Sequence, residues 1–357
     1  MSCKRVYLLL PGYTSHNHFE SADRASSHIE ARIEPSVFCF SDQYSSEPWQ
    51  SQFADMLGLD TGGGKRLPTA RLALIGRSQY SASSELAREQ GIVRADPIFL
   101  KADRDSARLV PAEQLALSET DADLLLNTLN DFVAVDGLEF FKLSASEWYM
   151  SGMSADSLDS YPPSFLANRN VSTFLPSGDS MASWRRLMTE LQMLLHNHPL
   201  NQQRVTAGLM PVNSLWFWGG GSLPAEHPPC PDVTVFADHV QAADMARHCD
   251  VPCRSLSSLI NLPANDMLET AQTIILDTTL VKAWLDADEN QLEQNLARIN
   301  HEWLAPLIEQ VRVGKLDEVH VLTEDGLQGH CNAQSIKEIT SKQRSSWFLS
   351  LTRLFRR

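Results

Sequence analysis

Short apolar runs alternate with helical patterns through the last third of the chain. Strand-like runs occupy residues 233–236, 273–276 and 317–322, and apolar residues at helical spacing occupy 239–249 and 292–313. Strands that are separated by helices pair in parallel, because each helical crossover returns the chain to the same edge of the sheet. The alternation therefore predicts an α/β fold in which helices cover the faces of a parallel sheet.

The N-terminal segment suits the same sheet. Residues 6–10 form an apolar run rich in strand formers, and Pro11 and Gly12 end it. Residues 37–40 and 71–75 have the composition of further strands. We therefore expect all three segments to be strands.

The pattern of apolar and polar residues changes after residue 96. Two alternating runs, 97–102 and 107–110, flank a turn, which predicts a β-hairpin. Ser118 with Asp121 three residues later predicts the start of a helix, and residues 138–143 read as another strand. This order predicts a compact α+β subdomain inside the α/β frame.

Charge and apolar runs exclude several classes of protein. The chain of 357 residues carries 30 basic and 44 acidic side chains, a net charge of −14. Because such a negative surface repels the phosphate backbones of nucleic acids, we expect no nucleic-acid partner. No run approaches the roughly 20 apolar residues that span a bilayer, and the run that ends at Leu10 is shorter than a signal-peptide core. With six scattered cysteines, these features predict a cytoplasmic protein.

Three consecutive glycines follow an aromatic strand pattern in the sequence Pro-Val-Asn-Ser-Leu-Trp-Phe-Trp-Gly-Gly-Gly at 211–221. Glycines let backbone N–H groups approach a ligand closely, and they equally allow a tight crossing of two chain segments. Both alternatives remain open. The candidate ligand-binding residues of this loop are Asn213, Trp216, Trp218, Gly219, Gly220 and Gly221.

A second candidate is the segment that begins at His198. Pro199 fixes the entry to a short helix, and Asn201 and Arg204, three residues apart, share one face of it. Arg204 offers a forked donor suited to an anionic group. The alternative is that Asn201 and Arg204 are buried and brace the domain.

Several motifs in the middle of the chain resemble known families. They are Asp-Pro-Ile-Phe-Leu-Lys-Ala-Asp-Arg-Asp at 96–105, Trp-Tyr-Met at 148–150, Leu-Pro-Ser-Gly at 175–178, Trp-Arg at 184–185, Glu-Leu-Gln-Met-Leu-Leu-His-Asn-His-Pro-Leu-Asn at 190–201 and Val-Asn-Ser-Leu-Trp-Phe-Trp-Gly at 212–219. Together they resemble a bacterial family described as regulatory protein, RpfE type, whose members are often labelled as cofactor-independent phosphoglycerate mutase-like. The run from His198 to Arg204, followed by Asn-x-x-Trp-x-Trp-Gly, is also similar to archaeal-type phosphoglycerate mutases of the alkaline phosphatase superfamily.

The resemblance implies a metal-binding α/β core interrupted by a small α+β domain. We therefore expect a phosphoglycerate-mutase-like core from residues 1–95 and 222–340, with an inserted domain at 96–221. Residues 341–357 form a separate basic tail.

The sequence departs from such mutases where they bind metal. The resemblance implies a first strand that ends in Asp-Gly, but here Pro11 precedes Gly12. The mutases carry an Asp-Glu-x-x-His-type cluster where this chain has Asp277-Thr-Thr, and an Asp-His pair where it has Glu324-Asp325. We therefore expect an eroded phosphotransfer site, no metal or other cofactor, and a regulatory or small-ligand-binding role with a small anionic ligand or a protein as partner.

The alternative is an active, metal-dependent phosphoglycerate mutase-like phosphotransferase or isomerase. It would hold Mn²⁺ or Zn²⁺ on a rearranged ligand set, because two divalent ions need about half a dozen anionic or imidazole ligands. The candidates for that set are Asp238, His239, Asp277, Asp325 and His330.

The tail at 342–357 holds five basic side chains and no acidic one. Trp347, Leu351 and Leu354 would share one face of a helix. Such a helix suits reversible peripheral contact with an anionic membrane. The alternative is a final helix docked on the domain.

Overall fold

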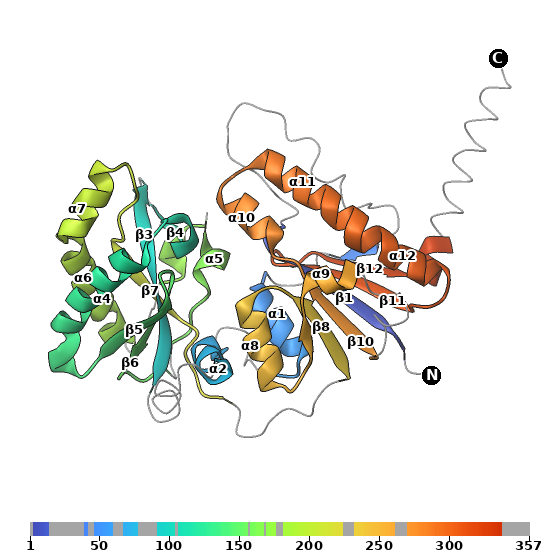
Figure 1. The fold of residues 1–357 in the computed structure, drawn as a ribbon, viewed down its shortest axis with the longest axis horizontal. Helices are drawn as coiled ribbons and strands as arrows, with labels where there is room; N and C mark the ends of the chain where they lie inside the picture. The colour runs from blue at the N-terminus through green and yellow to red at the C-terminus, as the bar shows by residue number, and fades with distance from the viewer. Residues whose placement is uncertain are drawn as a thin grey trace, which may run out of the picture. The chain divides into compact units, whose positions relative to one another are not determined.

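The computed structural model describes residues 3–13, 39–41, 46–59, 67–77, 91–103, 106–155, 158–167, 169–175, 181–223, 232–260 and 270–337. The chain divides into two compact units (Figure 1). Unit 1 comprises Met1–Trp49, Cys230–His239 and Val251–Arg357, and unit 2 comprises Gln50–Pro229 and Val240–Asp250.

Unit 1 is built on a sheet with the strand order β2-β12-β11-β1-β10-β8-β9 among the described residues. Its strands are β1 (Arg5–Leu10), β2 (Cys39–Ser41), β8 (Val233–Ala237), β9 (Cys253–Arg254), β10 (Gln272–Leu276), β11 (Glu318–Thr323) and β12 (Gln328–Asn332). The central strands β11, β1, β10, β8 and β9 are parallel, and β12 and β2 add antiparallel pairs at one edge. The predicted α/β class with a parallel-sheet core is therefore confirmed.

Helices cover one face of this sheet, as Figure 1 shows for α11 and α12. The helices of unit 1 are α9 (Leu256–Ile260), α10 (Thr279–Leu285), α11 (Glu289–Ile299) and α12 (Ala305–Arg312). A π-helical turn, Asn300–Leu304, joins α11 to α12, so the predicted helix at 292–313 forms as one nearly continuous element. Leu296 and Trp303 pack with Leu8 and Val319 in the buried core of the unit.

Unit 2 contains an antiparallel sheet with the order β4-β3-β6-β5, in which β7 also pairs with β3. Its strands are β3 (Ile92–Asp103), β4 (Ser106–Val110), β5 (Glu139–Ser144), β6 (Glu147–Ser151) and β7 (Ser214–Trp218). The predicted hairpin is β3 and β4, with Phe99 paired to Val110. The predicted strand at 138–143 is β5, so the α+β pattern read from the sequence is present.

The helices of unit 2 are α1 (Trp49–Met56), which begins at the boundary, α2 (Thr69–Gly76), α4 (Glu119–Val133), α5 (Pro163–Leu166), α6 (Ala182–His196), α7 (Pro199–Thr206) and α8 (Val240–His248). Among them, α2 packs against β3 and α8, α4 against β5, and α6 against β7. Ser118 caps α4 as predicted, since its side chain accepts a hydrogen bond from the backbone N–H of Asp121 at 3.1 Å. Trp148, Trp184 and Trp216 are almost fully buried in the core of the unit.

The structure differs from the sequence predictions at two places. The predicted strand at 71–75 was wrong, because these residues lie in helix α2, whose Ala70, Ala73 and Leu74 pack against Ile92 and Tyr149. Alanine and leucine are strong helix formers, and a short apolar run does not by itself separate a buried helix from a strand.

The boundary of the second unit also differs from the expected insert at 96–221. Residues 50–95 and 240–250 group with it, because β3 already begins at Ile92 and α2 packs against both β3 and α8. The predicted tail at 341–357 lies outside the described residues. Among the described residues, no helix has the length and apolar character that crossing a bilayer requires.

Candidate functional site

The carboxyl ends of the parallel strands in unit 1 are the natural place for a site. In open α/β sheets, ligands bind outside this edge of the sheet. Asp238 follows β8, Asp277 follows β10, Glu324 follows β11, and Pro11 and Gly12 follow β1. Whether this edge can bind a metal ion or a ligand depends on what the three carboxylates already contact.

Asp277 is completely buried, and both of its oxygens accept hydrogen bonds. Oδ1 accepts from the backbone N–H of Thr279 at 3.0 Å and from its hydroxyl at 2.5 Å. Oδ2 accepts from Arg298 Nη2 at 2.5 Å and from Trp303 Nε1 at 2.9 Å. Burial alone raises the pKa of Asp277, but these hydrogen bonds outweigh it and hold the pKa below its ordinary value. Asp277 is therefore an ionised carboxylate that ties β10 to the helices α10 and α11 and to the π-helical turn.

The other carboxylates at this edge also hold the protein's own backbone. Asp238 Oδ1 accepts from Ser255 Oγ at 2.7 Å and from the N–H of Leu256 at 3.3 Å, so it caps the start of α9. Glu324 Oε2 accepts from the N–H of Gly12 at 3.1 Å, and Oε1 accepts from the N–H of Trp49 at 3.1 Å.

Asp325 turns back on its own loop. Its Oδ1 accepts from the Thr323 hydroxyl and from the N–H of Leu327. At Gly12, a Cβ atom would lie 2.8 Å from the backbone of Val281, which explains the glycine. Pro11 stands where the resemblance implies a metal-binding Asp and is itself buried.

The alternative metal ligands do not come together as one set. His239 packs edge-on against Trp49, with ring centroids 4.8 Å apart. His330 lies within β12 opposite His320, away from the strand ends that carry Asp238 and Asp277. Among the described residues, the grouping with metal-ligand spacing is instead Glu318, His320 and His330.

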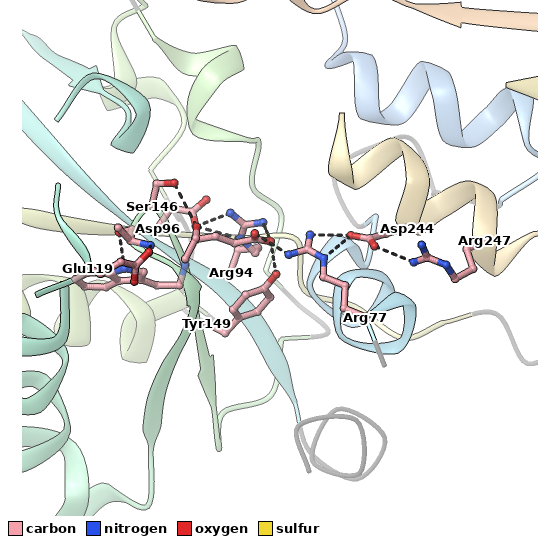
Figure 2. Close-up of polar contacts among 12 residues, drawn as sticks. Arg77, Arg94, Asp96, Glu119, Ser146, Tyr149, Asp244 and Arg247 are labelled. Atoms are coloured by element: carbon pink, nitrogen blue, oxygen red, sulfur yellow. Dashed lines mark hydrogen bonds and ion pairs between the residues drawn. The ribbon is translucent and has the colours of Figure 1, made fainter. Parts of the chain in front are cut away.

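Unit 2 holds a buried network of charged side chains (Figure 2). Arg94 on β3 donates to Asp96 Oδ1 through Nε and Nη2 at 3.0 and 2.8 Å, and to Glu147 Oε1 through Nη1 at 2.9 Å. Arg77 donates to Glu147 Oε2 at 2.8 Å and to Asp244 Oδ2 at 2.7 Å. Opposite charges thus alternate from β3 through β6 and the end of α2 to α8.

The pKa values of two carboxyl groups in this network, Asp96 and Glu147, are shifted in opposite directions. Burial raises the pKa of Asp96 to about 6, although Arg94 and Trp218 lower it. Burial also raises the pKa of Glu147, but Arg94, Arg77 and Tyr149 outweigh it and leave the pKa below its ordinary value. Each carboxylate faces an arginine, so the network is suited to fixing the unit rather than to binding a charged ligand.

Three of the motifs behind the family resemblance, at 96–105, 148–150 and 212–219, meet at this network. Asp96 Oδ2 accepts from Trp218 Nε1 at 2.7 Å, and Oδ1 accepts from the N–H of Trp148 at 3.3 Å. The sequence reading missed Arg94 and Arg77. An available signal was Arg94 and Asp96, two residues apart in an apolar strand and therefore on one face of it.

The aromatic strand of the predicted ligand loop is β7. The Asn213 side chain accepts from the N–H of Leu100 at 2.8 Å and donates to its carbonyl at 3.0 Å. Trp216 Nε1 donates to the carbonyl of Tyr161 at 2.9 Å. Both side chains therefore hold neighbouring backbone, while Asn213 also borders an open hollow in unit 2.

The glycines after β7 lie close to other parts of unit 2. Gly219 has a φ of +66°, and a Cβ atom there would overlap Thr69 Oγ1. A Cβ at Gly220 would lie 2.5 Å from Ala155 Cβ. Gly221 follows with a φ of 128°. These contacts favour the packing alternative for the loop.

A small polar cavity lies beside Gly219. It measures about 10 Å³ and is lined by Gln50, Thr69 and Ser160, among other residues. Gln50 Oε1, Thr69 Oγ1 and Ser160 Oγ are buried and have no hydrogen-bond partner among the described residues. Three converging polar atoms and this volume suit a single water molecule.

Asn201 and Arg204 share a helix face as predicted, and both are buried. Asn201 Nδ2 donates to the carbonyls of Leu195 and Val212 at 2.7 Å. Arg204 donates to the carbonyl of Met210 and pairs with Asp121 Oδ2 at 2.8 Å.

His198 caps the same helix. Its Nδ1 accepts from the N–H of Leu200 at 3.2 Å, and its Nε2 lies 3.0 Å from Thr128 Oγ1. The hydrogen bonds of all three residues favour the bracing alternative over an anion site.

Comparison with known proteins finds local similarity to one group of enzymes. No family model matches the chain. The chain is 38% identical over 64 residues to a 2,3-bisphosphoglycerate-independent phosphoglycerate mutase of Methanothrix thermoacetophila, covering 18% of this chain and 16% of the relative. It is 26% identical over 110 residues to the enzyme of the same name from Methanosarcina mazei, covering 30% of this chain and 28% of the relative.

Two solved structures resemble most of the chain at low identity. One is the PH0037 protein from Pyrococcus horikoshii, at 11% identity and a TM-score of 0.47, covering 93% of this chain and 88% of that one. The other is the cofactor-independent phosphoglycerate mutase from Thermoplasma acidophilum, at 14% identity and a TM-score of 0.42, covering 92% and 89%. The matched segments span less than a third of the curated relatives, and they support a relationship between this chain and the cofactor-independent phosphoglycerate mutases.

Proposed function

We propose that this protein is a regulatory or small-ligand-binding relative of the cofactor-independent phosphoglycerate mutases that has lost their two-metal phosphotransfer site. The observation that carries the proposal is the state of Asp277. Both of its oxygens are engaged by Thr279, Arg298 and Trp303, and the carboxylate is completely buried. A cation would have to displace the Arg298 guanidinium to reach it.

The rest of the strand edge supports the same proposal. Two-metal catalysis needs two ions about 3.5–4 Å apart, each held by anionic or imidazole ligands. Here Pro11 offers no ligand, and Asp238 and Glu324 hold backbone N–H groups. Membership of the RpfE-type regulatory family, which the motifs in the middle of the chain resemble, is part of the proposal. A cytoplasmic location without nucleic-acid partners is part of the proposal.

The proposed ligand is a small anion or a protein segment, and unit 2 offers a place for it. An open hollow lies between β3 and α6, bordered by Gln192, Met193, His196, Asn197 and Asn213 among others. Met193 is 66% exposed there, beside amide and imidazole groups. This combination of one apolar contact with polar neighbours suits a small polar ligand.

The experiment is a mutase assay on the full-length protein. Interconversion of 3-phosphoglycerate and 2-phosphoglycerate is followed with Mn²⁺, Mg²⁺ or Zn²⁺ present, and a known mutase serves as positive control. We expect no turnover above the protein-free rate with any metal. Metal-dependent turnover that is abolished in Asp277→Asn would overturn the proposal and establish the phosphotransferase alternative with Mn²⁺ or Zn²⁺.

Binding is tested separately from turnover. Calorimetric titration with 3-phosphoglycerate compares the wild type with His196→Ala, which changes an exposed side chain of the hollow. We expect the heat of binding to fall in the variant while its melting temperature stays unchanged. Equal heats in the two proteins would remove the hollow as the ligand site.

A further inference from the structure

One face of the core sheet in unit 1 carries a row of polar side chains. Along β1, β11 and β12 the buried side chains alternate with partly exposed ones. Val6, Leu8, Val319, Val321 and Cys331 belong to the buried core. The alternate positions, which point to the opposite face, are Arg5, Tyr7, Glu318, His320 and His330.

Three of these residues converge at the junction of β11 and β12. His320 on β11 is the direct register partner of His330 on β12, and Glu318 is two residues before His320 on the same face. The distance from Glu318 Oε2 to His320 Nε2 is 3.3 Å, and the distance from Glu318 Oε1 to His330 Nε2 is 3.7 Å. One ligand atom from each residue lies within 4.8 Å of the others.

We propose that Glu318, His320 and His330 form a binding site for a single divalent transition-metal ion of the Zn²⁺ type. Two imidazoles and one carboxylate are a ligand set for such an ion, whereas Mg²⁺ and Ca²⁺ prefer oxygen ligands. With bonds of about 2.0–2.1 Å, a tetrahedral ion needs its ligand atoms roughly 3.4 Å apart. Glu318 Oε2 and His320 Nε2 already lie close to that spacing, and one ligand atom from each of the three residues lies within 4.8 Å of the others, so small side-chain rotations would close the set on an ion.

The surroundings of the three residues suit an accessible site. Their side chains are 28%, 25% and 36% exposed for Glu318, His320 and His330, which leaves a path for the ion and a fourth position for water. The Tyr7 ring stacks on His320 with centroids 4.9 Å apart and an angle of 18°. Arg5 Nε donates to Glu318 Oε2 at 2.9 Å. These contacts orient two of the three ligands, as outer-shell partners do at metal sites.

The site is separate from the strand edge discussed above. Its residues lie within β11 and β12, and Asp238 and Asp277 contribute nothing to it. The proposal therefore does not depend on the loss of the phosphotransfer site. The competing account is a metal-free hydrogen-bonded cluster in which Glu318 serves only Arg5 and the two histidines.

The test uses the full-length protein after metal removal with a chelator. Zn²⁺ is titrated in competition with a chromophoric chelator, and Co²⁺ is added separately so that its visible spectrum reports the coordination number and the ligand type. The variants are His320→Gln, His330→Gln and Glu318→Gln. The matched control is His301→Gln, because His301 is an exposed histidine of the same unit outside the cluster.

We expect one Zn²⁺ per chain in the wild type and in His301→Gln, and affinity at least about 10-fold weaker in each ligand variant, since even an outer-shell change costs 10–100-fold. Zn²⁺ should raise the melting temperature of the wild type and the control but not of His330→Gln. Circular dichroism checks that each variant folds. If a histidine variant does not fold, Glu318→Gln, at the first residue of β11, takes its place in the comparison.

Three results would overturn the proposal. They are the absence of stoichiometric Zn²⁺ binding by the wild type, equal affinity in all four variants, and a thiolate charge-transfer band in the Co²⁺ spectrum. The last would place the ion on cysteines.

Discussion

Replacing Asp277 by alanine tests whether its carboxylate stabilises the fold or binds a metal ion. The substitution leaves the Arg298 guanidinium, the Trp303 indole N–H and the Thr279 hydroxyl without their shared acceptor. Removing one partner from a buried ion pair typically costs 3–5 kcal/mol. Because Arg298 is 31% exposed and can turn to water, we expect the lower end, about 3 kcal/mol.

The assay is urea unfolding of wild type and Asp277→Ala, each with excess chelator and with added Mn²⁺. We expect the same loss of stability under both conditions. The control is Asp286→Ala, because Asp286 forms an exposed pair with Lys282, and losing such a pair should leave the stability almost unchanged. If Asp277→Ala is as stable as the wild type in chelator and loses only a Mn²⁺-dependent gain, the structural account of Asp277 is refuted.

The pH dependence of the stability difference between wild type and Asp277→Ala is a second check. The folded pKa of Asp277 lies below its unfolded value, so its contribution is fully present above about pH 4 and is lost as the pH falls through the folded pKa. The stability difference between wild type and Asp277→Ala should therefore be constant from pH 5 to 7 and shrink below about pH 4. A difference that grows on acidification would contradict the assigned hydrogen bonds.

Three further predictions concern unit 2 and the tail. Arg204→Ala should lower the free energy of unfolding by about 3 kcal/mol, because it breaks the buried pair with Asp121. Arg186→Ala, at an 81% exposed arginine, should leave the stability almost unchanged. A loss of phosphate-binding heat in Arg204→Ala without loss of stability would favour the anion site instead. Gly219→Ala should be more destabilising than Gly208→Ala. Both glycines have a positive φ, but Gly208 has open space around it, so Gly208→Ala should cost only about 1–2 kcal/mol. Equal melting temperatures of the two variants would remove the packing account of the loop. Flotation with anionic liposomes, comparing full-length protein with a chain ending at residue 340, tests peripheral membrane contact by the tail, and unchanged flotation after truncation would exclude it.

The sheet of unit 1 was predictable because its pattern is local. β8 and β10 each read as a short apolar run with a helix after it, and crossover rules then place such strands in one parallel sheet. The N-cap at Ser118 is likewise a signal of four residues. The helix α2 was missed because an apolar run of this length is ambiguous until its tertiary contacts are known.

The sites were harder to predict because strand register assembles them. Asp96 meets Trp218 only because β7 pairs with β3 across more than a hundred residues. His320 meets His330 because β12 folds back on β11 in one particular register, and a shift by one residue would turn His330 to the other face. The sequence analysis named His330 as a candidate ligand but grouped it with Asp238, His239, Asp277 and Asp325, whereas the structure places it beside Glu318 and His320.

The most direct test of the eroded strand edge is anomalous diffraction from crystals of the full-length protein grown with Mn²⁺ and 3-phosphoglycerate. We predict no manganese peak within bonding distance of Asp277 and intact hydrogen bonds from Thr279, Arg298 and Trp303 to its carboxylate. Two manganese peaks roughly 3.5–4 Å apart at the carboxyl ends of β8 and β10, with Asp277 as a ligand, would contradict the account.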